Sequence, residues 1–79
     1  MTLSEIIKNR LNELNMSQTE LAIKLNSTRQ NLNNKMSRNN FTAKELTAIA
    51  EILGLQVLIK DDLGKEYLIE YKTEEDTTE

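Results

Sequence analysis

Amide, guanidinium and hydroxyl side chains are concentrated between residues 28 and 35 of this sequence. The side chains expected to face outward there are those of Thr28, Arg29, Gln30, Asn31, Asn33, Asn34 and Lys35. Arginine can form paired hydrogen bonds with guanine, and glutamine and asparagine can form them with adenine. Asparagine is also a poor helix former, so three asparagines within residues 28–36 cost helix stability. Reading base edges in DNA is a role that would compensate for that cost.

Charge is unevenly distributed along the chain. The formal net charge of -3 is unfavourable for binding an acidic partner. No Asp or Glu occurs from residue 21 to residue 44, however, and the acidic residues are densest from Asp61 to Glu79. The basic residues of the acid-free stretch are Lys24, Arg29, Lys35, Arg38 and Lys44. The distribution of charge therefore matters more than its sum.

Four helices are expected to position these side chains. The pattern Ser/Thr-x-x-Glu/Gln, in which two backbone donors are satisfied reciprocally at a helix start, occurs at Thr2–Glu5, Ser17–Glu20, Ser27–Gln30 and Thr42–Glu45. Apolar residues at helical spacing follow each match. The predicted helices cover about residues 3–15, 18–25, 28–36 and 43–53. Their predicted inward residues are Leu3, Ile6, Ile7, Leu11, Leu14, Leu21, Ala22, Leu25, Leu32, Met36, Leu46, Ile49, Ala50 and Leu53.

The second and third predicted helices are separated by only two or three residues. Ala22 is small and stands where two crossing helices would approach closely, and Asn26, in the turn, tolerates the left-handed conformation. This arrangement is that of a helix-turn-helix, whose second helix enters the DNA major groove. Gly54 stands where a left-handed cap would end the fourth helix.

Beyond Gly54 the apolar pattern alternates, which indicates a β-hairpin over about residues 55–71. The sequence Asp61-Asp-Leu-Gly64 between its two halves is typical of a turn. Residues 73–79 are polar and acidic without periodicity and are predicted to be a disordered tail. The expected fold is mainly α: one small four-helix domain containing a helix-turn-helix and ending in the hairpin, over residues 1–72.

The segment from about Ile7 to Leu55 resembles the Cro/CI-type (XRE-family) helix-turn-helix regulators of phages and other mobile elements. Three motifs carry the resemblance: Met16-Ser-Gln-x-Glu-Leu-Ala-x-Lys-Leu25, Thr28-Arg-Gln-Asn-Leu32 and Leu46-x-x-Ile-Ala-x-x-Leu-Gly54. Two positions depart from the family pattern, because the family usually has Gly at the position of Asn26 and Val or Ile at that of Ser27. Ser27 would gain an N-cap in exchange for an apolar contact.

The resemblance implies a role for each matching residue. Base reading falls to Arg29, Gln30 and Asn34, with Asn33 as a secondary candidate. Contacts with the DNA backbone fall to Gln18, which would also brace the third helix, and to Thr28, Lys35, Arg38 and Asn40. The expected partner is double-stranded DNA with a palindromic operator, and the expected role is that of a homodimeric transcriptional regulator that acts as a repressor.

Other chemistries are disfavoured by composition. The sequence has no Cys and no His, which removes disulfides, thiolate zinc sites and the commonest general base. Asp61 and Asp62 alone are a poor set of metal ligands. We therefore expect no enzymatic activity, no cofactor and no metal. No apolar run is long enough to span a membrane and no signal peptide is evident, so a cytoplasmic location is expected.

The hairpin is expected to form the homodimer interface, since an isolated hairpin is marginal in water and a strand edge can pair with a second copy. The residues assigned to that interface are Leu55, Val57, Ile59, Tyr67, Ile69 and Tyr71. An alternative stays open, in which the protein is an antitoxin or inhibitor-type interaction module whose hairpin docks onto another protein. The hairpin could also simply cover the core.

Overall fold

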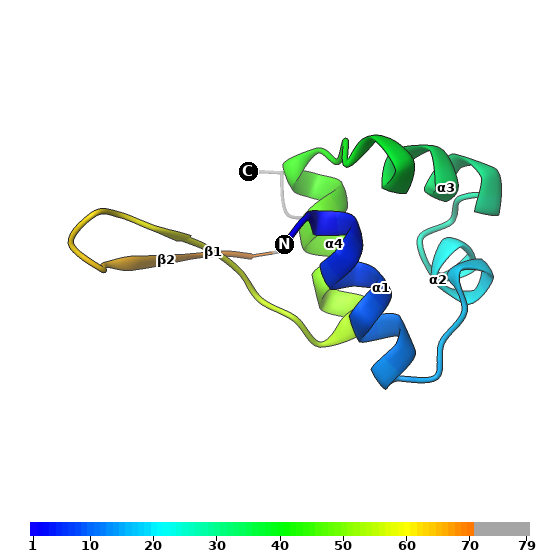
Figure 1. Ribbon diagram of the computed structural model, residues 1–79, viewed down its shortest axis with the longest axis horizontal. Coiled ribbons are helices and arrows are strands. Elements are labelled where there is room, and N and C mark those ends of the chain that lie inside the picture. The colour runs from blue at the N-terminus through cyan, green and yellow to red at the C-terminus, as the bar shows by residue number, and fades with distance from the viewer. Residues whose placement is uncertain (71–79) are drawn as a thin grey trace, which may run out of the picture. The chain divides into compact units, whose positions relative to one another are not determined.

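The computed structural model describes residues 1–70 and confirms the predicted fold class, four helices followed by a β-hairpin (Figure 1). The helices are α1 (Leu3–Glu13), α2 (Gln18–Lys24), α3 (Arg29–Arg38) and α4 (Ala43–Leu53), and the strands are β1 (Val57–Lys60) and β2 (Glu66–Ile69). Residues 1–42 form one compact unit, and the described residues from 43 to 70 belong to a second. Tyr71 and the predicted tail over residues 73–79 lie outside the described residues.

Two of the predicted capping boxes are confirmed at the starts of α1 and α2. The Glu5 backbone N–H donates to Thr2 Oγ1 at 3.2 Å, and the Thr2 N–H donates to Glu5 Oε1 at 2.9 Å. At α2, Ser17 and Glu20 make the same reciprocal pair at 3.0 and 2.9 Å. These bonds satisfy backbone donors that have no partner within the helix.

The predicted cap of the third helix at Ser27 is wrong by one residue. Thr28 is the N-cap, and its Oγ1 accepts from the Asn31 backbone N–H at 3.1 Å. Ser27 instead belongs to the end of the preceding helix, because its own N–H donates to the Ala22 carbonyl at 2.8 Å. The α3 helix therefore begins at Arg29.

Each helix is followed by a residue in the left-handed conformation. These residues are Asn15, Asn26, Asn39 and Gly54, with φ of 55°, 57°, 50° and 70°. In each case the N–H of the next residue reaches back to a carbonyl five positions earlier, at 2.9, 2.8, 3.1 and 2.8 Å respectively. This is the Schellman arrangement, which satisfies carbonyls left without partners at a helix end.

The left-handed residues explain where the helices end. The predictions for Asn26 and Gly54 are confirmed, whereas Asn15 and Asn39 were not assigned this role. Because Asn15 turns the chain, α1 stops at Glu13 rather than at residue 15. Because the corresponding turn of α3 comes only at Asn39, that helix continues to Arg38, two residues beyond its predicted end.

The buried apolar side chains of the first unit are Ile7, Leu11, Leu21, Ala22, Leu32 and Met36, all of which were predicted to face inward. Two predicted inward residues are wrong, since Ile6 and Leu14 are 38% and 40% exposed. Ile6 lies about 100° around the helix from Ile7 and leaves the buried stripe. Leu14 follows the last residue of α1. Leu3 and Leu25 are half-buried.

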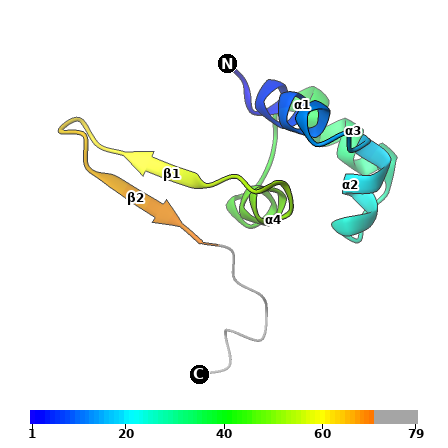
Figure 2. The same ribbon diagram turned by 90° about the horizontal axis from the view of Figure 1, so that it is seen from below.

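Two hydrogen bonds fasten the start of α1 to the end of α3. The buried hydroxyl of Ser4 donates to the Met36 carbonyl. The Ser4 backbone N–H donates to Asn39 Oδ1 at 2.9 Å. Figure 2 shows α1 and α3 next to each other within this unit. The C-terminal half of α3 is thus held against α1 by polar bonds as well as by apolar packing.

In the second unit, α4 buries Thr47, Ile49, Ala50 and Leu53, while Leu46 is half-buried. The strands pair antiparallel with Val57 opposite Ile69 and Lys60 opposite Glu66. The predicted turn is confirmed: the Gly64 N–H donates to the Asp61 carbonyl at 3.1 Å, and Gly64 has a φ of 89°. Asp61 Oδ1 also accepts from the N–H groups of Leu63 and Lys65, both at 2.9 Å.

Both faces of the hairpin are partly apolar and exposed. On one face, Val57 and Ile69 are half-buried, whereas Ile59 and Tyr67 are 58% and 47% exposed. On the other face the exposed apolar side chains are those of Leu58 and Leu68. Leu55, which was predicted to begin the first strand, instead completes the turn after α4. None of the helices within residues 1–70 is both long and apolar enough to cross a membrane.

Candidate nucleic-acid interface

The α3 helix presents a polar face that is almost opposite its buried side. Leu32 and Met36 are buried, and at about 100° per residue Asn34 lies opposite them, with Gln30 and Arg38 on either side. All three of these outer residues are exposed. The helix contains no Asp or Glu, so the face offers hydrogen bonds and positive charge without a carboxylate that would repel phosphate.

A hollow of about 210 Å³ lies at the C-terminal half of this face. It is lined by Asn31, Asn34, Lys35, Arg38 and Asn40. The structure therefore brings together four residues, Asn34, Lys35, Arg38 and Asn40, for which the resemblance implies DNA contacts. The left-handed turn at Asn39 brings Asn40 to the hollow after the helix has ended. A lining of amides and two cations suits an anionic oxygen such as that of a phosphate.

Asn31 lines the hollow but was not among the assigned site residues. The sequence spacing could have indicated this position, since residues 31, 34 and 38 recur at i, i+3 and i+7 and therefore lie along one face of a helix. Its backbone N–H donates to Thr28 Oγ1 at 3.1 Å, and Asn31 itself lines the hollow.

The N-terminal end of α3 holds a separate group of predicted residues. Thr28, Arg29 and Gln30 are exposed, and none of them lines the hollow at the other end. Arg29 Nη1 donates to Thr19 Oγ1 at 3.2 Å, so the guanidinium lies beside the first turn of α2. Asn33, the secondary candidate, is also exposed and lies on the flank of the helix between its buried and outer sides.

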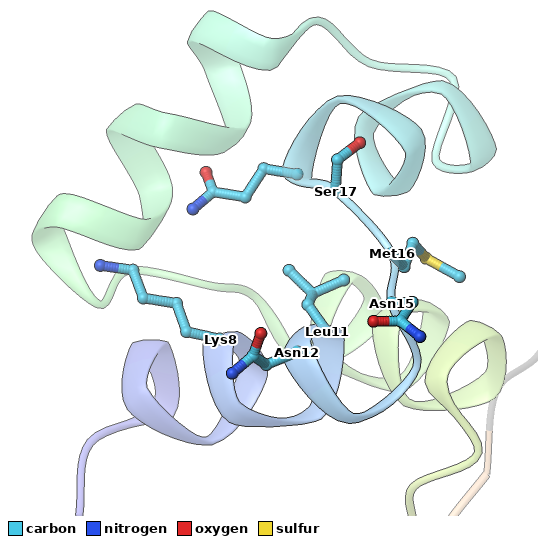
Figure 3. Close-up of a pocket in the computed structure, with 7 residues that line it drawn as sticks. Lys8, Leu11, Asn12, Asn15, Met16 and Ser17 are labelled. Atoms are coloured by element: carbon cyan, nitrogen blue, oxygen red, sulfur yellow. The ribbon is translucent and has the colours of Figure 1, made fainter.

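Gln18 occupies a different position from the rest. It is the first residue of α2, it is half-buried, and its Oε1 is buried without a hydrogen-bond partner among the described residues. It lines an open hollow of about 410 Å³ with residues of α1 and of the α1–α2 turn (Figure 3). Figure 3 shows Lys8 and Asn12 on the α1 side of this hollow and Ser17 at the start of α2.

Lys8 and Asn12 were not predicted to belong to the site. They are four residues apart, so they share a face of α1, and both are exposed. That spacing was visible in the sequence, but it is equally typical of an ordinary solvated helix face. The structure adds that Lys8 and Asn12 both line the hollow beside Gln18.

A family model matches residues 1–58, which include all four helices and the first two residues of β1. The chain belongs to this family, the domain of unknown function DUF6471. No curated protein and no solved structure matches the chain. The polar face of α3 and both hollows of this DUF6471 protein lie within the matched residues, whereas β2 lies beyond them.

Residues 1–70 of the DUF6471 protein contain no group of three or more Asp, Glu, His or Cys side chains that could hold a metal ion. The polar face of α3 offers amide groups for hydrogen bonding and the positive charge of Arg29, Lys35 and Arg38. Amide groups and guanidinium groups are spread along about ten residues of one helix, and they suit an extended polar ligand better than a compact one.

Proposed function

We propose that this protein binds double-stranded DNA sequence-specifically, with α3 in the major groove, and that it acts as a homodimeric transcriptional regulator of the repressor type. The observation that carries the proposal is the exposed face of α3. It bears amides and cations, has no carboxylate, and ends in a hollow suited to phosphate. The resemblance to Cro/CI-type regulators supports the same conclusion.

In the proposed complex, Gln30 and Asn34 read base edges from the centre of the outer face, with Asn33 beside them. Arg29 reads a base from the N-terminal end of α3. Its bond with Thr19 uses one of the five N–H donors of the guanidinium, so the others are available for a guanine.

Phosphate contacts are proposed at both ends of α3. Lys35, Arg38 and Asn40 surround the hollow at the C-terminal end. At the N-terminal end, the Thr28 oxygen accepts the capping bond while its hydroxyl hydrogen can still donate to a phosphate. Gln18 would use the donor end of its amide, since the oxygen end is buried.

The negative net charge does not oppose this proposal. DNA binding depends on the cations that contact phosphates, and each such contact contributes to the affinity and to its dependence on salt concentration. The residues from 21 to 44 carry cations and no acids, so the formal charge of α3 is positive although that of the whole chain is negative.

The Asn34→Ala variant tests the proposed base reading. Asn34 is exposed and alanine is a better helix former, so the variant is expected to fold. Losing a paired contact with a base should weaken binding to the preferred site by about 5- to 150-fold. Asn9→Ala, an exposed asparagine on α1, is the matched control and should bind like the wild type. Equal affinity of both variants would contradict the assignment.

A second function has one observation in its favour. Exposed apolar side chains of the hairpin, Leu58, Ile59, Leu63, Tyr67 and Leu68, could contact another protein, as in an antitoxin or inhibitor-type module. Arg29→Glu separates the two functions, because it should abolish DNA binding and leave a protein contact through the hairpin intact. The alternative would be favoured by two results together. A second protein would co-purify with both the wild type and the Arg29→Glu variant, and the wild type would bind no DNA.

A further inference from the structure

The outer edge of β1 carries backbone groups that no other strand within residues 1–70 pairs with. The Asp61 N–H donates to the Lys65 carbonyl at 2.9 Å, so Asp61 and Lys65 are a hydrogen-bonded pair next to the end of the ladder. Because hydrogen-bonded and non-hydrogen-bonded pairs alternate, Ile59 and Tyr67 exchange ladder bonds, whereas the N–H and C=O groups of Leu58 and Lys60 point outward. Within the described residues the sheet has two strands, so no third strand meets this edge.

We propose that β1 pairs antiparallel with β1 of a second copy of this chain, with Leu58 opposite Leu58 of the second copy at the twofold axis. The result would be a continuous four-stranded sheet in the order β2-β1-β1-β2. This inference rests on the proposed function only in that a twofold pair is what a palindromic DNA site requires.

Symmetry limits the possible registers. Opposite residues of an antiparallel pair have their side chains on the same face, and a twofold axis perpendicular to the sheet keeps each residue on its face. A residue can therefore oppose its own copy or a residue an even number of positions away. Because Leu58 has outward-pointing backbone groups, the register centred on it makes a reciprocal pair of hydrogen bonds at the axis.

Within two residues of the axis, the Leu58 register matches side chains by polarity. Val57 of each copy faces Ile59 of the other, on the face where Ile59 is 58% exposed. Gln56 faces Lys60, which pairs an amide with a cation and places no like charges together. Leu58, which is 44% exposed in the single chain, gains an apolar neighbour.

The competing registers place charged side chains opposite like charges or apolar side chains. If β2 paired with itself around Leu68, Glu66 would face Glu70 of the other copy. If it paired around Tyr67, Glu66 would face Leu68. If β1 paired around Ile59, Val57 would face Asp61. Like charges directly opposite each other destabilise a sheet, and a carboxylate opposite an apolar residue loses solvent without gaining a partner.

The sequence predicted pairing through a strand edge from either half of the hairpin and did not include Leu58 among the interface residues. The proposed interface specifies the edge of β1 and centres it on Leu58. Tyr67 and Ile69, which were assigned to the interface, then lie on β2 at the outside of the sheet.

Charge substitutions at Leu58 test the proposal in the full-length protein by sedimentation velocity over a concentration series. Leu58→Glu and Leu58→Lys each place two like charges across the axis, with their Cα atoms about 5.5 Å apart. Each variant alone should raise the dimer dissociation constant by about tenfold or more. An equimolar mixture of the two should restore dimers, because opposite charges then meet. Circular dichroism checks that each variant is folded.

Leu68→Glu and Leu68→Lys are the matched controls. Leu68 lies directly across the ladder from Leu58, on the same face, and is 48% exposed. In the proposed dimer it is on the outer strand, so these variants should dimerise like the wild type. A monomeric wild type, unchanged dimers of the Leu58 variants, a failed mixture, or loss of dimers on substituting Leu68 would each overturn the proposal.

A separate binding measurement distinguishes this inference from the proposed function. Anisotropy at low salt with a DNA half-site reports on α3 alone. If half-site binding persists but the dimer tests fail, only the β1 interface is wrong. If the dimer tests succeed and no DNA is bound, the interface stands and the proposed DNA-binding function fails.

Discussion

The side chain of Asn39 accepts a hydrogen bond from the backbone N–H of Ser4 at 2.9 Å, while its own backbone adopts the left-handed conformation that ends α3. One residue thus stops the proposed recognition helix and ties it to the first turn of α1. The bond also satisfies one of the N–H groups that a helix start leaves without a partner.

Substitutions at Asn39 should separate these two roles. Asn39→Gly keeps the left-handed conformation and loses the acceptor, so it should lower the free energy of unfolding by about 1–2 kcal/mol. Asn39→Ala also strains the backbone and should cost about 1 kcal/mol more. Asn26→Gly, at a residue with the same conformation, is the control and should be nearly neutral. Urea unfolding measures all three; equal stability of the Asn39 and Asn26 glycine variants would contradict this role.

The cap of α3 yields a second prediction. Thr28→Ala removes the oxygen that accepts from the Asn31 N–H and should lower the free energy of unfolding by about 1 kcal/mol. Ser27→Ala should have a much smaller effect, because the bond made by Ser27 comes from its backbone. The midpoints of urea unfolding compare the two variants. A larger loss at Ser27 would mean that the helix begins one residue earlier.

Salt dependence tests the phosphate contacts. Arg38→Gln should reduce the slope of log affinity against log salt concentration by about 0.9, the value for one phosphate contact with duplex DNA. It should weaken binding to all sequences alike. Lys24→Gln, at the exposed last residue of α2, is the control and should leave the slope unchanged. A change in sequence preference without a change in slope would assign Arg38 to base reading.

The turn of the hairpin should depend on one of its two neighbouring acids. Asp61 Oδ1 accepts from two backbone N–H groups, so Asp61→Ala should destabilise the hairpin by about 1–3 kcal/mol. The exposed Asp62 is the control, and Asp62→Ala should have little effect. Amide hydrogen exchange of β1 and β2 measures the difference. Equal protection in both variants would show that the Asp61 side chain is dispensable.

Much of the fold could be predicted because the local signals were strong and short-range. The capping boxes at Thr2 and Ser17 and the caps at Asn26 and Gly54 depend on residues only a few positions apart. Asn15 and Asn39 were missed because asparagine occurs both within these helices and after them, so its type alone does not mark an end. Thr28 was missed as a cap because Ser27 beside it is an equally good candidate by type.

The site could be predicted only in part, for a different reason. The composition of residues 28–40 indicated which side chains are polar and outward, but not which of them share a hollow. The grouping of Asn31 and Asn40 depends on the length of α3 and on the turn at Asn39, and the bond between Arg29 and Thr19 depends on how α2 packs against α3. Those are tertiary features, which local patterns do not specify.

Selection of bound sites from a random pool of duplex DNA tests whether α3 reads a specific DNA sequence. We expect an enriched palindrome whose half-sites lie about one helical turn, or roughly 10–10.5 base pairs, apart. Asn34→Ala should relax the preference at one position of each half-site. Failure of folded protein to enrich any sequence at low salt would contradict the proposal that α3 reads DNA.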